Sequence, residues 1–195
     1  LHTIGETSAK ASIITEVIAD VGAQIHYASI DTLGQQTRAY LNRQAKVYDH
    51  ATVDWANAEF NDGDTIIRLA SQLDCEGATS HANVIALTHQ RQVQGLVTTI
   101  QNTGRHTLGH IFQRGVILDR STLVFNGIGQ ITKGAKGSDA QQESRVLMLS
   151  RHARGDANPL LLIDENDVTA GHAASVGRVD ENQLYYLMSR GLSEE

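Results

Sequence analysis

Apolar and polar residues alternate along most of this chain, and that period of two restricts the possible folds more than any other feature. In ASIITEVIAD, Ile13, Thr15 and Val17 fall on one face, while Ser12 and Glu16 fall on the other. The alternation recurs in AQIHYASID, around Trp55, around Leu69, and in the runs NVIALTH, QGLVTTIQN, TLGHIFQRGVILD, STLVFNGIGQIT, SRVLMLS and NPLLLID. Successive side chains of a β-strand point to opposite faces, so the pattern predicts a chain that is mainly β.

Short polar segments separate these runs and predict turns at intervals of roughly ten to fifteen residues. They include DTLGQQ, FNDGD, QNTGR and ARGDAN. A two-sheet sandwich and a coiled β-helix both fit such spacing, and periodicity alone does not separate them. Aromatic residues make up only 5% of the chain, and many strand positions carry Gln, Thr or Asn. That composition favours a thin solenoid, although the absence of a strict sequence repeat argues against one.

The tail departs from the alternating pattern and predicts one short helix. Asp180 precedes ENQLYYLMSRG, Gln183 stands at the capping-box position, and Gly191 is placed to end the helix. We therefore divide the chain into a β core domain, residues 1–179, and the start of a C-terminal helical segment, residues 180–195. The chain begins without Met and stops as a second helix would begin, so we interpret it as a fragment with a truncated helical segment.

Charge and composition exclude several classes of partner. The net charge of −6 comes with scattered basic residues, so we expect no nucleic acid and no anionic membrane as partner. No apolar run is long enough to cross a bilayer. A single cysteine and the absence of a secretory leader predict a cytoplasmic protein.

Two groups of potential ligands are better explained as structural residues. Cys75 falls on the apolar side of its predicted strand, with no second cysteine nearby, so we expect it to be buried and inert. His106 and His110 have a helical spacing, but TLGHIFQ reads as strand, which would separate them by over ten ångströms, roughly four rises of 3.3 Å. We therefore expect independent surface histidines.

His172 is the candidate functional residue, because DVTAGHAASVGRVD surrounds it with small side chains. If Val168 points to the core, Ala170, His172 and Ala174 share its face; otherwise the ring projects outward. Both orientations remain open. A structural histidine is the simpler interpretation, but small neighbours would let another surface approach the imidazole closely, as a ligand at an interface requires.

The run Gln141 to Ser193, beginning QQESRVLMLSRHARGDANPLLLID, closely resembles the C-terminal part of the SufB/SufD family, and the SufD-type subunit in particular. Weaker likeness extends through ASIITEVIADVGAQIHYASID, NDGDTI and FNGIGQITKGAKGSDA. The resemblance implies a right-handed parallel β-helix, here followed by a short C-terminal helix. It also implies membership of a SufBCD complex, in which the SufC ATPase supports iron-sulfur cluster assembly.

By the same resemblance, His172 matches a SufD histidine at the SufB–SufD interface. SufB-type subunits carry a functional cysteine in the segment where this chain has Glu143, and acidic residues where it has Gly171 and Ala173. Some SufD relatives place a cysteine two residues before the histidine, where this chain has Ala170. These departures favour the SufD type and transfer no thiolate role.

One cysteine cannot supply the four thiolates that a typical cluster needs. We therefore expect an iron-sulfur cluster only as a transient species shared with a partner, and none in the isolated chain. A neutral His172 imidazole would contribute one metal ligand, with its other nitrogen held by an acceptor that the sequence does not identify.

The resulting hypothesis is a scaffold subunit, not an enzyme, that pairs with a SufB-type subunit and a SufC-type ATPase and forms a homodimer when isolated. One alternative is a β-helix carbohydrate-active enzyme, which would require Asp, Lys and Arg to converge in a groove. The other is a purely architectural subunit in which His172 binds no metal.

Overall fold

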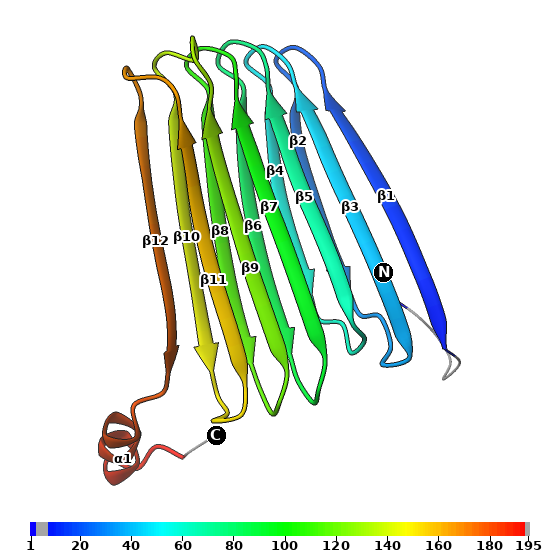
Figure 1. The fold of residues 1–195 in the computed structure, drawn as a ribbon, viewed down its shortest axis with the longest axis vertical. Helices are drawn as coiled ribbons and strands as arrows, with labels where there is room; N and C mark the ends of the chain where they lie inside the picture. Colours follow the sequence, from blue (N-terminus) through cyan, green and yellow to red (C-terminus); the bar gives the residue numbers. More distant parts are fainter. Residues whose placement is uncertain (3–7, 194–195) are drawn as a thin grey trace.

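The computed structural model describes residues 1–2 and 8–193, which form a β-solenoid and one helix (Figure 1). The strands are β1 (Ala9–Ala19), β2 (Gln24–Asp31), β3 (Thr37–Val47), β4 (Thr52–Glu59), β5 (Thr65–Leu73), β6 (Thr79–Thr88), β7 (Val93–Asn102), β8 (Leu108–Ile117), β9 (Thr122–Ile131), β10 (Asp139–Met148), β11 (Arg154–Ile163) and β12 (Thr169–Arg178). Helix α1 (Glu181–Ser189) follows β12.

Consecutive strands alternate between two parallel sheets. The odd-numbered strands form one six-stranded sheet in the order β1-β3-β5-β7-β9-β11, and the even-numbered strands form the other, from β2 to β12. Each turn of the solenoid thus contributes one strand to each sheet, which makes six turns. The predicted parallel β-helix with a short C-terminal helix is confirmed. No helix in the described ranges is both long and apolar enough to span a membrane.

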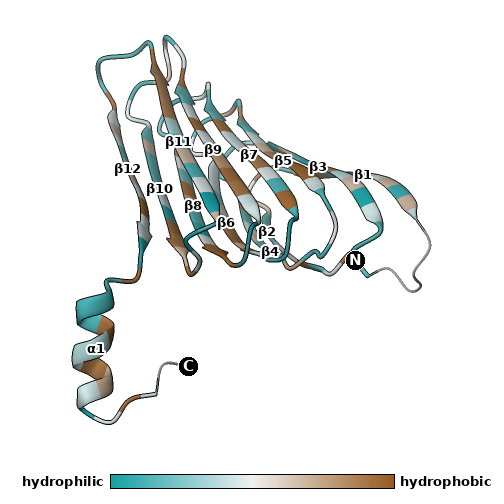
Figure 2. Ribbon diagram, turned by 60° about the horizontal axis from the view of Figure 1, so that its bottom comes forward, coloured by the Kyte–Doolittle hydropathy of each residue, from teal (hydrophilic) through white to brown (hydrophobic). Residues whose placement is uncertain are grey.

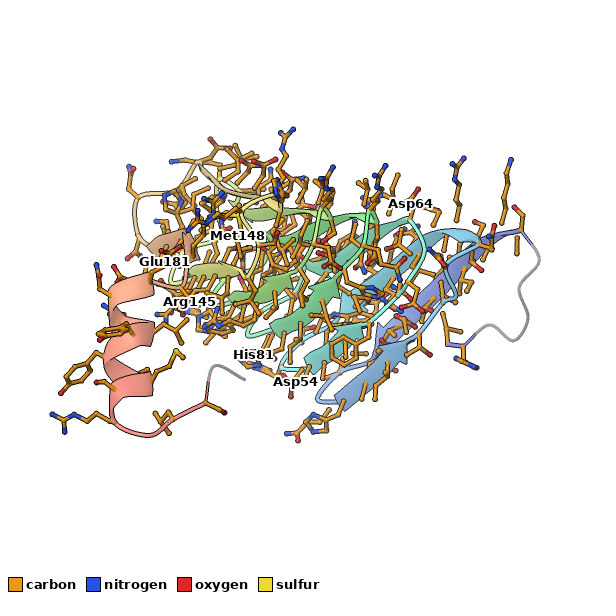
Figure 3. The ribbon with its side chains drawn as sticks, turned by 90° about the horizontal axis from the view of Figure 1, so that it is seen from below. Asp54, Asp64, His81, Arg145, Met148 and Glu181 are labelled. Carbon is orange, nitrogen blue, oxygen red and sulfur yellow. The ribbon has the colours of Figure 1, made fainter. Side chains whose placement is uncertain are left out.

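The core lies between the two sheets, whose ribbons face each other in Figure 2. Side chains from alternate strand positions fill it (Figure 3). Trp55 and Phe125 are its largest fully buried side chains. Gln94 and Gln113 are also fully buried, and the Gln113 amide donates to Thr98 Oγ1 at 3.0 Å. Polar side chains enter this core because a neighbouring turn can supply their hydrogen bonds, which explains the low aromatic content.

One corner of the solenoid repeats although the sequence does not. Gly22, His50, Gly77, His106 and Gly137 all have positive φ, between 52° and 73°. Their N–H groups each donate to a carbonyl oxygen one turn further along, at 2.7 to 2.9 Å. A Cβ on either Gly77 or Gly137 would lie 2.3 Å from the Nδ1 of the histidine in the preceding turn. The repeat is therefore one of backbone conformation, and sequence identity is not needed to preserve it.

Three local predictions were wrong. ARGDAN does not form a turn: Arg154 begins β11 and its guanidinium bonds Asp156 on the same face at 3.0 Å. Cys75 lies in the turn after β5 and is only half-buried. His106 occupies the corner described above rather than a strand. In all three cases, contact with the adjacent turn overrides the local pattern.

Strand β3 was not predicted, because a charged residue stands at one of its inward positions. Arg43 is 3% exposed and forms ion pairs with Glu59 Oε1 at 2.8 Å and with Asp31. The two carboxylates close strands β4 and β2 and are fully buried. Leu41 and Ala45 flank Arg43 on the same buried face. A buried cation is tolerated when carboxylates pair with it, and this pairing becomes visible only when β2, β3 and β4 are stacked.

Glu59 shares the guanidinium of Arg43 with Asp31, and its pKa is far from the ordinary value of a glutamate. Desolvation by burial raises the pKa of the Glu59 carboxyl to about 7, although the charge of Arg43 opposes this rise. Burial also lowers the pKa of Arg43, but the charges of Glu59 and Asp31 outweigh it and leave that pKa above its ordinary value. Near neutral pH, Glu59 therefore exchanges its proton while Arg43 stays charged.

We expect the stability contributed by Glu59 to fall as pH rises from about 4.5 to about 7. Over that window the folded state holds a proton that the unfolded state has lost, so raising the pH favours unfolding, by up to about 3 kcal/mol. Glu59→Gln removes this titration. Urea denaturation at several pH values gives the free energy of unfolding of both proteins. Across the window, the wild type should lose stability relative to Glu59→Gln as the pH rises. Glu16→Gln, at an exposed position on β1, should show no such trend. Parallel pH profiles for wild type and Glu59→Gln would contradict the assignment.

Candidate functional site

His172 lies on β12, the last strand of the even-numbered sheet, and is exposed. Its register partner on β10 is Gln142, which is 4% exposed and in register with the buried Ile111 on β8. Paired residues on parallel strands share a face of the sheet, so His172 continues a column of inward-facing side chains. Val168 packs against the core, which agrees with this orientation. The question left open by the sequence is therefore decided: His172 is on the inward face.

The imidazole is exposed because the solenoid ends at this strand. No described strand pairs with the outer edge of β12 (Figure 1). Ala170 and Ala174 flank His172 on the same face, so small side chains surround the ring at the open end. The result is an inward-facing position that no turn in the described part of the chain covers.

A polar layer lies one strand away from His172. Gln142 donates from its amide nitrogen to the Leu160 carbonyl oxygen on β11 at 2.7 Å. Its Oε1 is buried and has no hydrogen-bond partner among the described residues. Ser144 donates to Gln113 Oε1 at 2.8 Å in the same layer. Gln142 Oε1 lies beside Gly127 on β9, 2.7 Å from where a Cβ of that residue would stand. Gln142 and His172 are neighbours through strand register, which the sequence alone does not reveal.

The chain offers few metal donors around His172. In the part of the chain that the structure describes, no three His, Cys, Asp or Glu side chains form a ready metal site. Cys75, the single cysteine, lies in the turn after β5, and β5 belongs to the sheet that does not contain β12. Glu143 faces away from His172, on the outer surface, and forms ion pairs with Arg114 and Arg145. A cluster at His172 would need ligands from outside these residues.

The two terminal strands differ in their capacity to pair further. β11 contains Pro159, the only proline of the chain. Proline in a sheet directs its missing N–H to a free edge, so the outer edge of β11 lacks a donor there. β12 contains no proline and keeps its backbone donors and acceptors. Leu160, Leu162 and Val176 are between 39% and 47% exposed on these two strands. β12 is therefore the better edge for β-augmentation.

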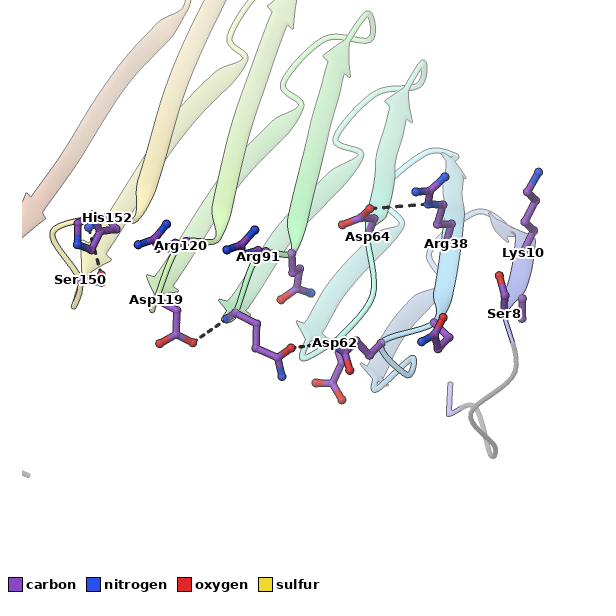
Figure 4. A pocket seen from close by; sticks show the side chains of 15 residues that line it. Ser8, Lys10, Arg38, Asp62, Asp64, Arg91, Asp119, Arg120, Ser150 and His152 are labelled. Carbon is purple, nitrogen blue, oxygen red and sulfur yellow. Dashed lines mark hydrogen bonds and ion pairs between the residues drawn. The ribbon is translucent and has the colours of Figure 1, made fainter.

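A groove of about 1120 Å³ runs along the corner that leads into the odd-numbered strands (Figure 4). Asp62, Asp64 and Asp119 line it together with the basic residues Lys10, Arg38, Arg91 and Arg120. This is the combination that the carbohydrate-active alternative required, so the groove must be considered as a rival site.

Each of the three groove carboxylates is already engaged in holding the fold. Asp62 bonds His89 Nε2 at 2.9 Å, and Asp119 accepts the backbone N–H of Gln90 at 2.7 Å. Asp64 accepts the N–H of Val93 at 3.0 Å and pairs with Arg38 at 3.8 Å. Glycoside hydrolysis needs an acid and a second carboxylate free to act on the substrate. In the described part of the chain, each groove carboxylate is tied to the fold through at least one of its oxygens.

Comparison with known proteins identifies the family of the chain. The sequence model described as "SUF system FeS cluster assembly, SufBD core domain" matches residues 1–195. The chain belongs to the SufB/SufD family. Among curated relatives, the iron-sulfur cluster assembly protein SufD of Bacillus subtilis is 44% identical over all of this chain and 45% of its own length. The resemblance to the SufD type is thereby confirmed.

Two more distant relatives carry family-level names. An iron-sulfur cluster assembly SufBD family protein of Mycobacterium leprae is 29% identical over 94% of this chain and 21% of its own length. One from Staphylococcus saprophyticus is 27% identical over 97% of this chain and 41% of its own length. The chain thus spans less than half the length of these relatives. Membership of the SufB/SufD family supports a role in iron-sulfur cluster assembly.

Proposed function

We propose that this chain is the core of a cytoplasmic, non-enzymatic scaffold subunit that pairs with a SufB-type subunit and works with a SufC-type ATPase to assemble iron-sulfur clusters. The observation that carries the proposal is the position of His172: an exposed imidazole on the inward face of an edge strand that no described strand covers. The cluster is the cargo of this assembly, held transiently between subunits.

Pairing at β12 would complete the site. Adjacent strands lie about 4.8 Å apart, so a partner strand added to β12 would place its own side chains directly against His172. A partner thiolate could then bind the same cluster as the imidazole, which compensates for the shortage of sulfur donors in this chain. When the SufB-type partner is absent, a second copy of the chain can use the same edge, which predicts a homodimer.

Gln142 is the proposed positioning residue for His172. The nitrogen of a metal-bound imidazole that faces away from the metal is usually held by an acceptor, which fixes the tautomer and the ring orientation. Gln142 Oε1 is buried, has no partner in the described part of the chain, and belongs to the residue paired with His172. Because this oxygen lies beside Gly127 on β9, the Gln142 amide would have to turn toward β12 to supply that hydrogen bond.

Helix α1 supports a second docking surface. Asp180 caps it by accepting the N–H groups of Asn182 and Gln183, as predicted. None of its residues is buried, and Tyr186 and Leu187 are 55% and 45% exposed. We propose that residues 180–195 begin the helical segment that contacts the SufC-type partner, and that residues 1–179 form the β core domain.

Changing His172 to alanine should lower cluster content without preventing assembly. The full-length protein would be co-expressed with its SufB-type and SufC-type partners, purified anaerobically, and analysed for iron and acid-labile sulfide per complex. We expect His172→Ala to lose most of the iron and sulfide, because one cluster ligand is missing. His172→Cys restores a metal donor and should recover part of it, and Gln142→Ala should show an intermediate loss.

His89→Ala is the matched control, since His89 is bonded to a carboxylate far from β12 and should leave cluster content unchanged. Equal cluster content in His172→Ala and wild type would reject the ligand role and favour a purely architectural subunit. Failure of the wild-type protein to form any complex with the two partners would reject the scaffold proposal itself.

A further inference from the structure

A line of titratable side chains crosses the outer face of the even-numbered sheet, on the surface opposite to His172. His26 on β2 is in register with Asp54 on β4, Asp54 with His81 on β6, and His81 with His110 on β8. Asp139 begins β10 at the end of this line. The sequence separates these residues widely, so only the stacking of successive turns brings them together.

Asp54 fixes the orientation of His81. Its Oδ1 lies 2.6 Å from His81 Nδ1, and its Oδ2 lies 3.0 Å from His26 Nδ1 (Figure 3). When Nδ1 donates to a carboxylate, the lone pair of a neutral imidazole is on Nε2. No hydrogen bond or ion pair involves His81 Nε2 in the described ranges, so this nitrogen can accept a metal ion. A carboxylate behind the ring is the arrangement common in metal-bound histidines.

His110 supplies a second imidazole with an unsatisfied nitrogen. Its ring centroid lies 5.6 Å from that of His81, and Phe112 packs against its other side at 6.2 Å. Nε2 is buried and makes no hydrogen bond to the described residues. Buried polar atoms nearly always have a partner, and the ion-pair neighbour of this nitrogen among the described residues is the Asp139 carboxylate, beyond normal hydrogen-bond distance. A bound ion would satisfy the nitrogen.

Asp139 lies close enough to His110 to act as a third ligand. Its Oδ2 lies 3.5 Å from His110 Nε2, too far for a normal hydrogen bond but close to the separation of two atoms bound to one ion. The other oxygen, Oδ1, accepts the Gln141 amide at 2.8 Å, which orients the carboxylate. The side chains of His81, His110 and Asp139 are 36%, 21% and 35% exposed. Because His110 Nε2 itself is buried, an ion reaches it only when the side chains around it move.

We propose that His81, His110 and Asp139 bind a divalent transition-metal ion of the zinc class, with Asp54 as the positioning residue for His81. Metal–nitrogen bonds of about 2.1 Å would place two imidazole centroids about 5 Å apart, only slightly closer than they are here. Two imidazoles and a carboxylate also form a donor set typical of such ions. No three His, Cys, Asp or Glu side chains among the described residues are placed to hold a metal ion as they stand, so binding requires the His81 ring and the Asp139 carboxylate to move toward His110. The site is independent of His172.

Cobalt is a suitable probe, because bound Co²⁺ has visible absorption bands that report nitrogen and oxygen ligation. The full-length protein, freed of metal with a chelator, would be titrated with Co²⁺ and then with Zn²⁺ as competitor. We expect one Co²⁺ per chain whose bands disappear on Zn²⁺ addition. His81→Ala and His110→Ala should each weaken binding by about tenfold or more, and Asp54→Asn by about tenfold.

His89→Ala is again the matched control, because His89 pairs with Asp62 in the same manner but belongs to no line of ligands. It should bind Co²⁺ as the wild type does. His110→Gln, which keeps a polar side chain, replaces His110→Ala if that variant does not fold, and a melting temperature raised by Zn²⁺ in wild type but not in His110→Gln gives a second readout. The proposal is overturned if the His81 and His110 variants bind Co²⁺ like wild type, or if His89→Ala loses binding equally. Neither result bears on cluster content at His172.

Discussion

Replacing Arg43 with alanine is expected to lower the free energy of unfolding by about 3–5 kcal/mol, because it leaves two buried carboxylates without their cation. Asp31 and Glu59 are both fully buried, and Arg43 pairs with each of them. Asn61 donates to Glu59 Oε2 at 3.2 Å but cannot neutralise it. The loss should appear in urea denaturation followed by circular dichroism.

Arg38→Ala is the matched control, since Arg38 is on the same strand, is 77% exposed, and pairs with Asp64 at 3.8 Å. Exposed pairs of this kind contribute about 0–1 kcal/mol. The triple variant Arg43→Met, Asp31→Asn, Glu59→Gln removes all three charges and should recover much of the lost stability. An Arg43→Ala protein as stable as Arg38→Ala would show that the buried pairing has little energetic importance.

Trp55→Ala should destabilise the solenoid by about 3–5 kcal/mol, the range for deleting a large buried aromatic side chain. Trp55 is 0% exposed and packs edge-on against Tyr27 at 5.0 Å. Its indole nitrogen donates to Ser71 Oγ at 3.0 Å, and Ser80 donates to the same oxygen at 2.8 Å. The substitution therefore leaves both a cavity and a weakened hydrogen-bond network. Because Trp55 is the single tryptophan, unfolding must be followed by circular dichroism rather than fluorescence.

Two further variants separate the contributions at this position. Trp55→Phe keeps most of the apolar volume and should lose only about 1–2 kcal/mol, mainly through the missing bond to Ser71. Tyr185→Ala, on the exposed surface of α1, should change stability by less than about 0.5 kcal/mol. Equal losses for Trp55→Ala and Trp55→Phe would mean that the hydrogen bond, not the packing, dominates.

The predicted fold was most accurate where side chains alternate simply, and it failed where the interior is polar. β4, with buried Val53 and Trp55, follows the period of two without interruption. β3 was missed because Arg43 occupies an inward position that a local pattern assigns to the surface. The turn predicted at Arg154 failed because β9 pairs with that segment and holds it extended.

The candidate site shows the same division. The small neighbours of His172 predicted a closely approachable imidazole, and its exposure at an edge strand agrees with that. Its inward orientation and the adjacent Gln142 could not be predicted, since both depend on the register between β10 and β12. The pairing of His81 with His110 could not be predicted either, because the two residues are far apart in the sequence and meet only through the register between β6 and β8.

The sequence by itself determined most of the strands, the capped helix after Asp180 and the scarcity of thiolates, because period, capping and composition are local properties. Tertiary structure alone decided which residues meet: Arg43 with two carboxylates, His172 with Gln142, and His81 with His110 and Asp139. In this solenoid, the histidine contacts join residues one turn apart in the same sheet, and the Arg43 contacts join the two sheets across the core. The number of residues differs from one turn of the solenoid to the next. The register between neighbouring strands therefore depends on how their backbones stack.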